Sequence, residues 1–227
     1  RVISKIPERR LYAFDRRTGH LLWSHFDVLD GPLTARFKGH CACGPPIVVG
    51  DTVYAPTHDR SNAIAFYLSA YDLHTGEVKW RRLVCSSQQD VNMFGNARTE
   101  FVASPLLAQN GTIYGSTNLG VCFAVDMATG QPRWLAAYDV VPVPETRLMG
   151  QRDRPVYFAN NPPACVDGVL ACMPLDSEYV LGLDADTGKL LWRLPFEARC
   201  SGSNDVRWLL GGSDHEFVLA GAGVVAV

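Results

Sequence analysis

Short apolar, β-branched runs alternate with turn-forming residues along the whole chain, and no stretch shows the spacing of an amphipathic helix. One run occurs four times without gaps, and each copy carries Asp, then Thr-Gly three and four residues later, then Trp eight residues later. The copies are LYAFDRRTGHLLW (11–23), LSAYDLHTGEVKW (68–80), CFAVDMATGQPRW (122–134) and VLGLDADTGKLLW (180–192), spaced 57, 54 and 58 residues apart. An internal repeat of this length indicates stacked copies of one supersecondary unit.

The motif predicts a strand, a tight turn and an antiparallel strand. The Asp carboxylate can accept hydrogen bonds from the turn amides, and the glycine can take the positive φ of a bulged hairpin. A second hairpin is predicted between successive motifs, because Gly50-Asp51, Asn110-Gly111 and Asp167-Gly168 each separate two apolar runs. Each repeat is therefore a meander of four antiparallel strands, which we label A to D.

Repeated four-stranded meanders predict an all-β chain folded as a β-propeller, whose blades pack radially. The chain opens in strand C of one blade and closes in strands A, B and the start of C of another. We therefore expect an arc of a larger ring, with incomplete blades at both ends. The predicted boundaries are a partial blade at 1–40, blades at 41–82, 103–135 and 160–194, and a partial blade at 206–227.

The pattern A-x-D-x-x-T-G-x-x-x-W resembles the tryptophan-docking motif of pyrroloquinoline quinone (PQQ) repeats. Ala13-Phe14-Asp15, Ala70-Tyr71-Asp72, Ala124-Val125-Asp126 and Gly182-Leu183-Asp184 carry the resemblance. The PQQ-repeat family includes quinoprotein alcohol dehydrogenases and the propeller lipoprotein of the outer-membrane assembly machine. The resemblance implies an eight-bladed ring in which each tryptophan stacks on the next blade. The implied docking residues are Trp23, Trp80, Trp134 and Trp192 with Gly19, Gly76, Gly130 and Gly188.

Both ends of the sequence bear on this arc. It starts at Arg1 and stops at Val227, inside a run that is typical of a strand. We expect a piece of a longer protein whose remaining blades are its nearest partners. An arc cut within a blade exposes apolar faces, so the isolated piece should associate or aggregate.

Composition excludes several classes of protein. With 47% hydrophobic residues and a net charge of −2, the chain is neither disordered nor a basic nucleic-acid binder. No apolar run approaches the roughly 18 residues of a membrane span. Seven cysteines form an odd set that does not fit a disulfide scaffold.

Any site should lie on the face formed by the B–C and D–A loops, because the D–A connections at 81–103, 135–160 and 193–205 are long. The third B–C loop contributes Asp176, Ser177 and Glu178 to this face. The candidate binding residues on the loop face are His58, Asp59, Arg60, Arg98, Glu100, Asn160 and Asn161.

The sequence predicts no metal site. His40, Cys41 and Cys43 offer soft ligands, but no second ligand pair follows at zinc spacing, which favours packing instead. Cys165 and Cys172 lie on the two arms of one hairpin. A cross-strand disulfide is open if the two are opposite one another, and two buried thiols are the favoured alternative.

The leading hypothesis is a non-catalytic binding scaffold without a cofactor, for protein–protein interaction in the periplasm or cell envelope. The alternative is a PQQ- and calcium-dependent dehydrogenase that oxidises alcohols or sugars. The enzyme signatures of the resembling family are poorly met, because there is no adjacent Cys-Cys pair and Asn160-Asn161-Pro162-Pro163 matches only part of the metal-site segment. No catalytic residue is assigned. A sensor domain fused to a kinase or membrane anchor is a third alternative.

Overall fold

The computed structural model describes residues 9–25, 41–59, 63–87, 101–142, 156–196, 206–221 and 224–226, and every regular element in them is a β-strand. The chain divides into two compact units, Arg1–Phe101 and Val102–Val227. Within the described ranges no helix is long and apolar enough to cross a bilayer. The chain is all-β, as its alternating pattern predicts.

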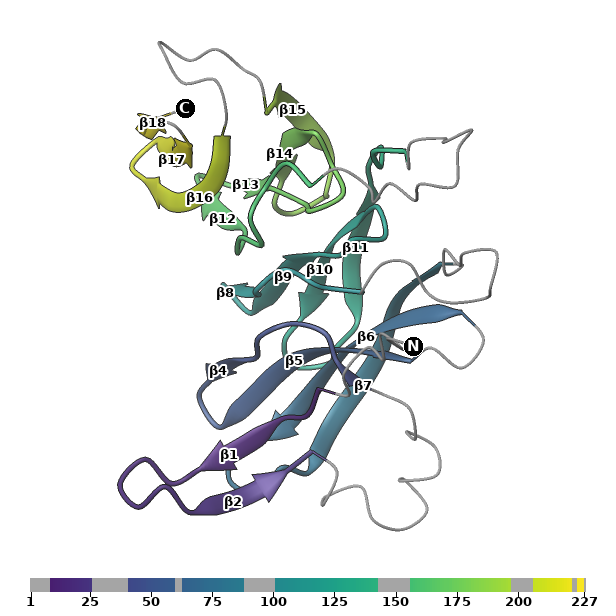
Figure 1. Cartoon of the computed structure of the whole chain (residues 1–227), viewed down its shortest axis with the longest axis vertical. Coiled ribbons are helices and arrows are strands. Elements are labelled where there is room, and N and C mark those ends of the chain that lie inside the picture. Colours follow the sequence, from purple (N-terminus) through teal and green to yellow (C-terminus); the bar gives the residue numbers. More distant parts are fainter. Residues whose placement is uncertain are drawn as a thin grey trace, which may run out of the picture. The chain divides into compact units, whose positions relative to one another are not determined.

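The first unit holds two sheets (Figure 1). Strands β1 (Tyr12–Phe14) and β2 (Leu21–Ser24) form a hairpin. The other sheet runs through β5 (Thr52–Asp59), β6 (Ile64–Asp72) and β7 (Val78–Ser87). Its first strand is split, because β3 (Cys41–Ala42) and β4 (Ile47–Val49) both pair with β5. Pro45 and Pro46 lie in the gap between them, where they cannot donate to the ladder.

The second unit holds two four-stranded meanders and a three-stranded one. Its strands are β8 (Leu107–Gln109), β9 (Thr112–Ser116), β10 (Val121–Asp126) and β11 (Pro132–Ala137), then β12 (Ala164–Val166), β13 (Val169–Cys172), β14 (Tyr179–Asp184) and β15 (Leu190–Pro195), then β16 (Val206–Ser213), β17 (Glu216–Gly221) and β18 (Val224–Ala226). These sheets are propeller blades.

The A–B turns follow the predicted chemistry. In β8–β9 and β12–β13 the two turn residues both have positive φ, 50° and 73° at Asn110-Gly111 and 47° and 78° at Asp167-Gly168. Two positive φ values match the twist of the flanking strands, which is why Asn-Gly and Asp-Gly occur there. The A–B hairpin between β16 and β17 turns at Asp214, with φ of 52°.

The C–D turns have one common geometry, seen clearly at Asp184. Its Oδ1 accepts hydrogen bonds from the Thr187 amide at 2.8 Å and the Thr187 hydroxyl at 2.7 Å. The Gly188 amide donates to the Asp184 carbonyl at 2.8 Å, and Gly188 has φ of 72°. The turns at Asp15, Asp72 and Asp126 make the same set of bonds, with glycine φ of 71°, 73° and 72°.

These turns carry the contact that joins neighbouring blades within each unit. The Trp134 indole lies over Gly188, where an added Cβ would stand 2.6 Å from the ring, and its Nε1 donates to the Ala185 carbonyl at 2.8 Å. Trp23 does the same in the first unit, over Gly76 and to the Leu73 carbonyl at 2.9 Å.

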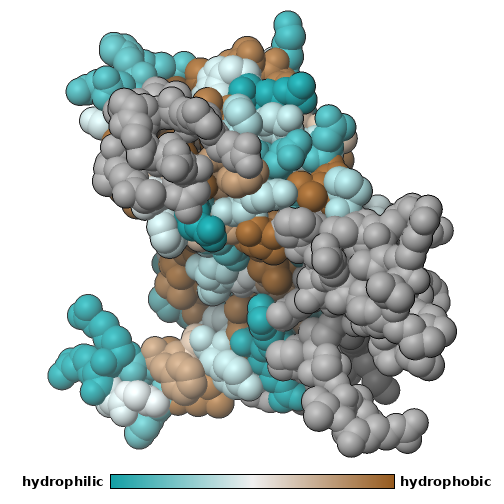
Figure 2. Space-filling view, turned by 45° about the horizontal axis from the view of Figure 1, so that its top comes forward, coloured by the Kyte–Doolittle hydropathy of each residue, from teal (hydrophilic) through white to brown (hydrophobic). Residues whose placement is uncertain are grey.

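Burial of the tryptophans makes this contact strong. Trp23 is 7% exposed and Trp134 is 8% exposed. A buried indole removes about 150–250 Å² from water, and at about 25 cal/mol per Å² that corresponds to about 4–6 kcal/mol as an upper figure. On the face shown in Figure 2, apolar and polar residues are interspersed.

The docking geometry predicts an asymmetry between two glycines of one sheet. Both Gly188 and Gly168 have positive φ, but only Gly188 has an indole above it, while Gly168 has nothing within 4 Å of an added Cβ. Replacing Gly168 by Ala should cost about 1 kcal/mol of backbone strain. Gly188→Ala should cost about 3 kcal/mol, because strain and displacement of Trp134 add. Urea unfolding of both variants checks this, and equal losses would contradict the docking role of Gly188.

The turn carboxylates titrate below their ordinary range. The pKa of Asp126 is lowered to about 2, first by the hydrogen bond from Arg133 and then by the bonds from Thr129. The stabilisation that the Asp126 carboxylate contributes is therefore present above about pH 4 and is lost as pH falls through about 2.

In Arg133→Gln the pKa of Asp126 should rise but stay below 3.8, because the Thr129 bonds remain. An NMR pH titration measures this, with the unchanged turn at Asp184 as internal control, and an unaltered Asp126 pKa would refute the assignment to Arg133.

Candidate functional site

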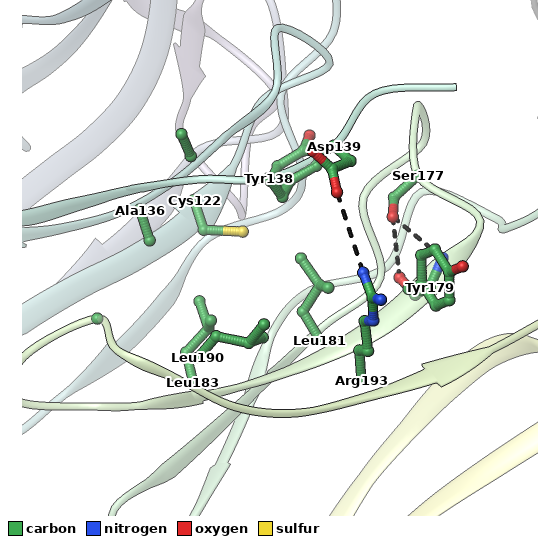
Figure 3. A pocket seen from close by; sticks show the side chains of 12 residues that line it. Cys122, Ala136, Tyr138, Asp139, Ser177, Tyr179, Leu181, Leu183, Leu190 and Arg193 are labelled. Atoms are coloured by element: carbon green, nitrogen blue, oxygen red, sulfur yellow. Dashed lines mark hydrogen bonds and ion pairs between the residues drawn. The ribbon is translucent and has the colours of Figure 1, made fainter. Parts of the chain in front are cut away.

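A cleft of about 370 Å³ opens in the second unit between the sheet of β8–β11 and the sheet of β12–β15 (Figure 3). One wall comes from β10 and β11, and the other comes from β14, β15 and the loop before β14. The lining residues used below are Cys122, Ala136, Tyr138, Asp139, Ser177, Tyr179, Leu181, Leu183, Leu190 and Arg193. The cleft is thus a gap between two neighbouring blades.

Its floor is apolar because of strand alternation. Leu181 and Leu183 are two residues apart on β14, so both project to the face of the sheet that meets the neighbouring blade. Cys122 lies opposite them on β10, with its sulfur directed toward the cavity (Figure 3). Leu190, on β15, is 49% exposed and marks the outer end of the floor. An apolar side chain of a ligand fits this floor.

The rim carries charge of both signs. The guanidinium of Arg193 lies 3.9 Å from the carboxylate of Asp139 and 4.7 Å above the ring of Tyr179 (Figure 3). The Arg193 and Asp139 side chains are 54% and 95% exposed, so their ion pair contributes little to stability. A charged group of a ligand can therefore replace either partner at low cost.

A buried carboxylate holds the inner end of the cleft together. Asp176 is 2% exposed and accepts a hydrogen bond from the Gly120 amide of the neighbouring blade at 3.1 Å. The Tyr138 hydroxyl lies 2.5 Å from Asp176 Oδ1 and 2.6 Å from the Thr117 carbonyl, and its single proton serves one acceptor at a time. The Val141 amide donates to the Asp176 carbonyl. These bonds join the two blades at the loop end, as Trp134 joins them at the turn end.

Two groups beside the cleft are held in their neutral forms. Burial raises the pKa of Tyr138 well above its ordinary value, and the negative charge of Asp176 adds to the rise. The pKa of the Cys122 thiol is raised well above its usual value by its hydrogen bond with Cys172 and by burial. A thiol with a raised pKa is a poor nucleophile at neutral pH. The cleft is therefore suited to binding rather than to covalent chemistry at Cys122.

Several cleft residues come from the connections that the sequence assigned to the loop face. Ser177 lies in the third B–C loop, and Tyr138 and Asp139 lie in the second D–A connection. Arg193, which the sequence placed at the start of the third connection, lies in β15 instead. The individual residues were missed apart from those of the B–C loop. The signal for Leu181 and Leu183 was their two-residue spacing, but no sequence pattern pairs a strand with its neighbour in the next blade.

The candidates of the first unit lie elsewhere. His58 lies in β5, is 5% exposed, and its ring stands edge-on to Phe101 at 5.4 Å. It faces Cys41 across the β3–β5 ladder, and Asp59 ends the strand. A buried histidine in a ladder is a packing residue rather than part of an open loop. Three candidates lie outside the described residues, namely Arg60, Arg98 and Glu100.

Asn160 and Asn161, the candidates of the second unit, hold the main chain. The side-chain amide of Asn160 donates to the Ala103 carbonyl at 3.2 Å. The side-chain amide of Asn161 donates to the carbonyls of Ala159 at 2.9 Å and Arg207 at 3.1 Å, and Asn161 is 6% exposed. Their donors therefore hold segments of the second unit together, which is a structural role.

The first unit contains a buried polar cluster that sequence analysis missed. The Tyr71 hydroxyl lies 2.9 Å from His25 Nε2, and Arg81 donates to Tyr71 at 3.1 Å and to Ser69 at 2.9 Å. Burial raises the pKa of Tyr71. His25 follows the docking tryptophan Trp23 by two residues, so the cluster strengthens the same blade-to-blade contact.

The cysteines form no disulfide at the predicted hairpin. Cys165 lies opposite Leu170 and Cys172 lies opposite Leu181, so the two cysteines are not cross-strand partners, and both are thiols. Cys172 is buried, whereas Cys165 is only partly buried. Across the described residues, no three His, Cys, Asp or Glu side chains gather closely enough to hold a metal ion.

Comparison with known proteins identifies a family. The sequence profile of a family described as outer membrane protein assembly factor BamB matches residues 1–147 of the chain. No match was found among the curated proteins.

Solved structures show the same fold at low identity. BamB from Moraxella catarrhalis is 19% identical with a TM-score of 0.51, over 89% of this chain and 50% of that one. A quinohemoprotein alcohol dehydrogenase from Comamonas testosteroni is 18% identical with a TM-score of 0.50, over 97% and 35%. The computationally designed Ika8 protein is 15% identical with a TM-score of 0.50, over 94% and 50%. The chain thus spans half the length of that BamB, and these likenesses show the propeller fold alone.

The buried Tyr138 hydroxyl predicts a loss of stability in alkali. Because its pKa is higher in the folded protein than the value of about 10 in the unfolded chain, its contribution is complete below pH 10 and falls as pH rises through the folded value. One such group gives a slope of about 1.4 kcal/mol per pH unit. Tyr138→Phe should remove this part of the fall in the free energy of unfolding with pH. The part that the other buried tyrosines and Cys122 contribute should remain.

Urea unfolding at pH values from 8 to 11.5 measures the slope. Tyr12→Phe is the matched control, because it also removes one tyrosine hydroxyl and Tyr12 is 52% exposed. Equal slopes for Tyr138→Phe and Tyr12→Phe would contradict a buried hydroxyl at the cleft.

Proposed function

The chain belongs to the family of PQQ-repeat β-propellers described as outer membrane protein assembly factor BamB, and from that membership we propose that it is a non-catalytic scaffold segment that binds another protein in the bacterial envelope. The family description supplies the envelope location and the expectation of a protein partner. The cleft of the second unit is the observation that carries the proposal, because it offers an anchor point for one side chain of a partner.

An extended segment of the partner suits this surface. β11 is the edge strand of its sheet, so one side of it has no partner strand in the described sheet order. Ala136 of this strand lines the cleft, whereas Leu135, which is 48% exposed, projects to the opposite face of the sheet. A segment that adds main-chain hydrogen bonds along an edge strand gains affinity from the backbone and specificity from a side-chain pocket. Here that pocket is the apolar floor, with Arg193 and Asp139 at its rim.

The residues near the partial quinoprotein match do not fit a PQQ and calcium site. A calcium site takes six to eight oxygen ligands, several of them carboxylates. Asn160 and Asn161 instead donate to main-chain carbonyls, and Asn161 is buried among them. The dehydrogenase alternative therefore receives no support from this segment.

Calorimetric titration separates the two functions. PQQ with calcium, titrated into the protein, should give no binding heat while the protein remains folded by circular dichroism. Near-stoichiometric, calcium-dependent binding at micromolar affinity or tighter would overturn the scaffold proposal in favour of the dehydrogenase.

A paired substitution tests the cleft as the binding surface. Position 190 lines the cleft, whereas Leu210 on β16 is 60% exposed and lies outside the cleft lining. A photo-crosslinking residue at position 190 in cells should trap one envelope protein that position 210 does not trap. With that protein purified, Leu190→Asp should weaken binding about ten-fold or more, because a charge enters an apolar floor, and Leu210→Asp should leave it unchanged. Equal effects of the two substitutions would rule out the cleft.

A further inference from the structure

Two buried cysteines meet between the sheet of β8–β11 and the sheet of β12–β15. Cys122 on β10 is 0% exposed, and Cys172 on β13 is 1% exposed. Both belong to one apolar core to which the two sheets contribute, and a hydrogen bond joins their thiols. Aliphatic side chains would fill such a core equally well, so the meeting of two thiols points to their chemistry.

The position of Cys122 along its strand is half-way between the two joints of these blades. Cys122 lies two residues before Ala124, which pairs with the docking residue Trp134. It also lies two residues after Gly120, whose amide donates to the carboxylate of Asp176. One joint is therefore on each side of the Cys122 thiol.

Cys172 has the matching position on the facing sheet. It lies four residues before Asp176, and its cross-strand partner Leu181 lies four residues before Ala185. The carbonyl of Ala185 accepts the hydrogen bond from the Trp134 indole. Both thiols are thus placed at the middle of the interface, where the joints on either side hold the two sheets against each other.

A third cysteine borders the same core, but the strand register excludes it as a partner. Cys165 pairs with Leu170 across the β12–β13 ladder, so it lies diagonal to Cys172. Diagonal neighbours in an antiparallel ladder have Cα atoms about 7–8 Å apart. A disulfide spans about 4.4–6.8 Å between Cα atoms. Among the described cysteines, Cys122 is therefore the partner for Cys172.

We propose that Cys122 and Cys172 are oxidised to a disulfide that braces the two blades between their joints. The oxidant is another disulfide, either oxidised glutathione or the disulfide of a thiol oxidoreductase. One cysteine thiolate attacks the oxidant and displaces a first thiol, and the second cysteine thiolate attacks the mixed disulfide and displaces the other thiol. The two cysteines lose two electrons and two protons, which convert one oxidant disulfide into two thiols.

This exchange takes place before the two sheets have packed. In the folded protein the pKa of Cys122 is raised, so little thiolate is present at neutral pH, and burial keeps an oxidant away from both sulfurs. In a chain whose sheets are still apart, both thiols are open to exchange. The supply of the oxidant in the cell rests on the proposed envelope location, whereas the pairing of the two cysteines does not.

Refolding of the full chain from urea tests the pairing. The chain is refolded with a mixture of oxidised and reduced glutathione, its remaining thiols are alkylated, and its peptides are analysed by mass spectrometry without reduction. The peptide of Cys122 should be linked to the peptide of Cys172. Cys165→Ala is the matched control and should keep this link. Cys122→Ala should lose it and should form no link between Cys165 and Cys172, because their diagonal register is unchanged.

Thermal unfolding tests whether the link braces the blades. The disulfide closes a loop of about fifty residues, which restricts the unfolded chain. Protein refolded with oxidised glutathione should therefore melt about 5 °C or more above protein refolded with a reductant. Cys165→Ala should show the same difference. The two preparations of Cys122→Ala should melt at the same temperature, with circular dichroism confirming that both are folded.

Three results would overturn the proposal. The first is folded protein, refolded with oxidised glutathione, in which both Cys122 and Cys172 are alkylated. The second is a link from Cys172 to Cys165 in place of Cys122. The third is an equal melting temperature of the linked and the reduced protein, since the link would then brace nothing. None of these results bears on the binding partner of the cleft, which the paired substitution at Leu190 and Leu210 tests separately.

Discussion

The contact between a tryptophan and the glycine turn of the next blade is the constraint on which this fold depends. A blade is a sheet with two faces, and it is stable only when both are covered. The motif solves this with four residues at fixed spacing. Asp and Thr shape the turn, glycine leaves room above it, and the indole of the preceding blade fills that room. The glycine therefore has two independent reasons to be glycine, a positive φ and a ring at van der Waals distance.

The candidate site follows from the same constraint. Two blades joined at their turn ends by Trp134 and at their loop ends by Asp176 and Tyr138 enclose a cleft between the two joints. Its position is thus fixed by contacts that do not themselves touch a ligand. Trp134 and Asp176 are buried, so the two joints hold the blades together at both ends of the cleft. The rim residues Arg193 and Asp139 are exposed.

The loop connections contribute more to the cleft than the individual polar candidates do. The third B–C loop and the second D–A connection supply Ser177, Tyr138 and Asp139 to its lining, and of these the sequence analysis named only Ser177. His58, Asn160 and Asn161 lie outside that lining and are engaged in packing and main-chain bonds. Asparagines beside prolines are typical of exposed loops. Main-chain carbonyls that lack a strand partner still need hydrogen-bond donors, however, and here the asparagine side chains donate to them. Which side chain supplies the donor depends on the neighbouring blade.

The sequence by itself determined the repeat, the four-stranded blade and the turn chemistry, because each turn depends on residues fewer than about twelve positions apart, and it marked Trp23 and Trp134 as docking residues. Tertiary structure alone decided what lies between blades. The partnership of Asp176 with Gly120, of Cys122 with Cys172, and of Leu181 with the wall of β11 joins residues about fifty positions apart. Such pairs are set by how two separately folded sheets pack, and local sequence carries no record of that register.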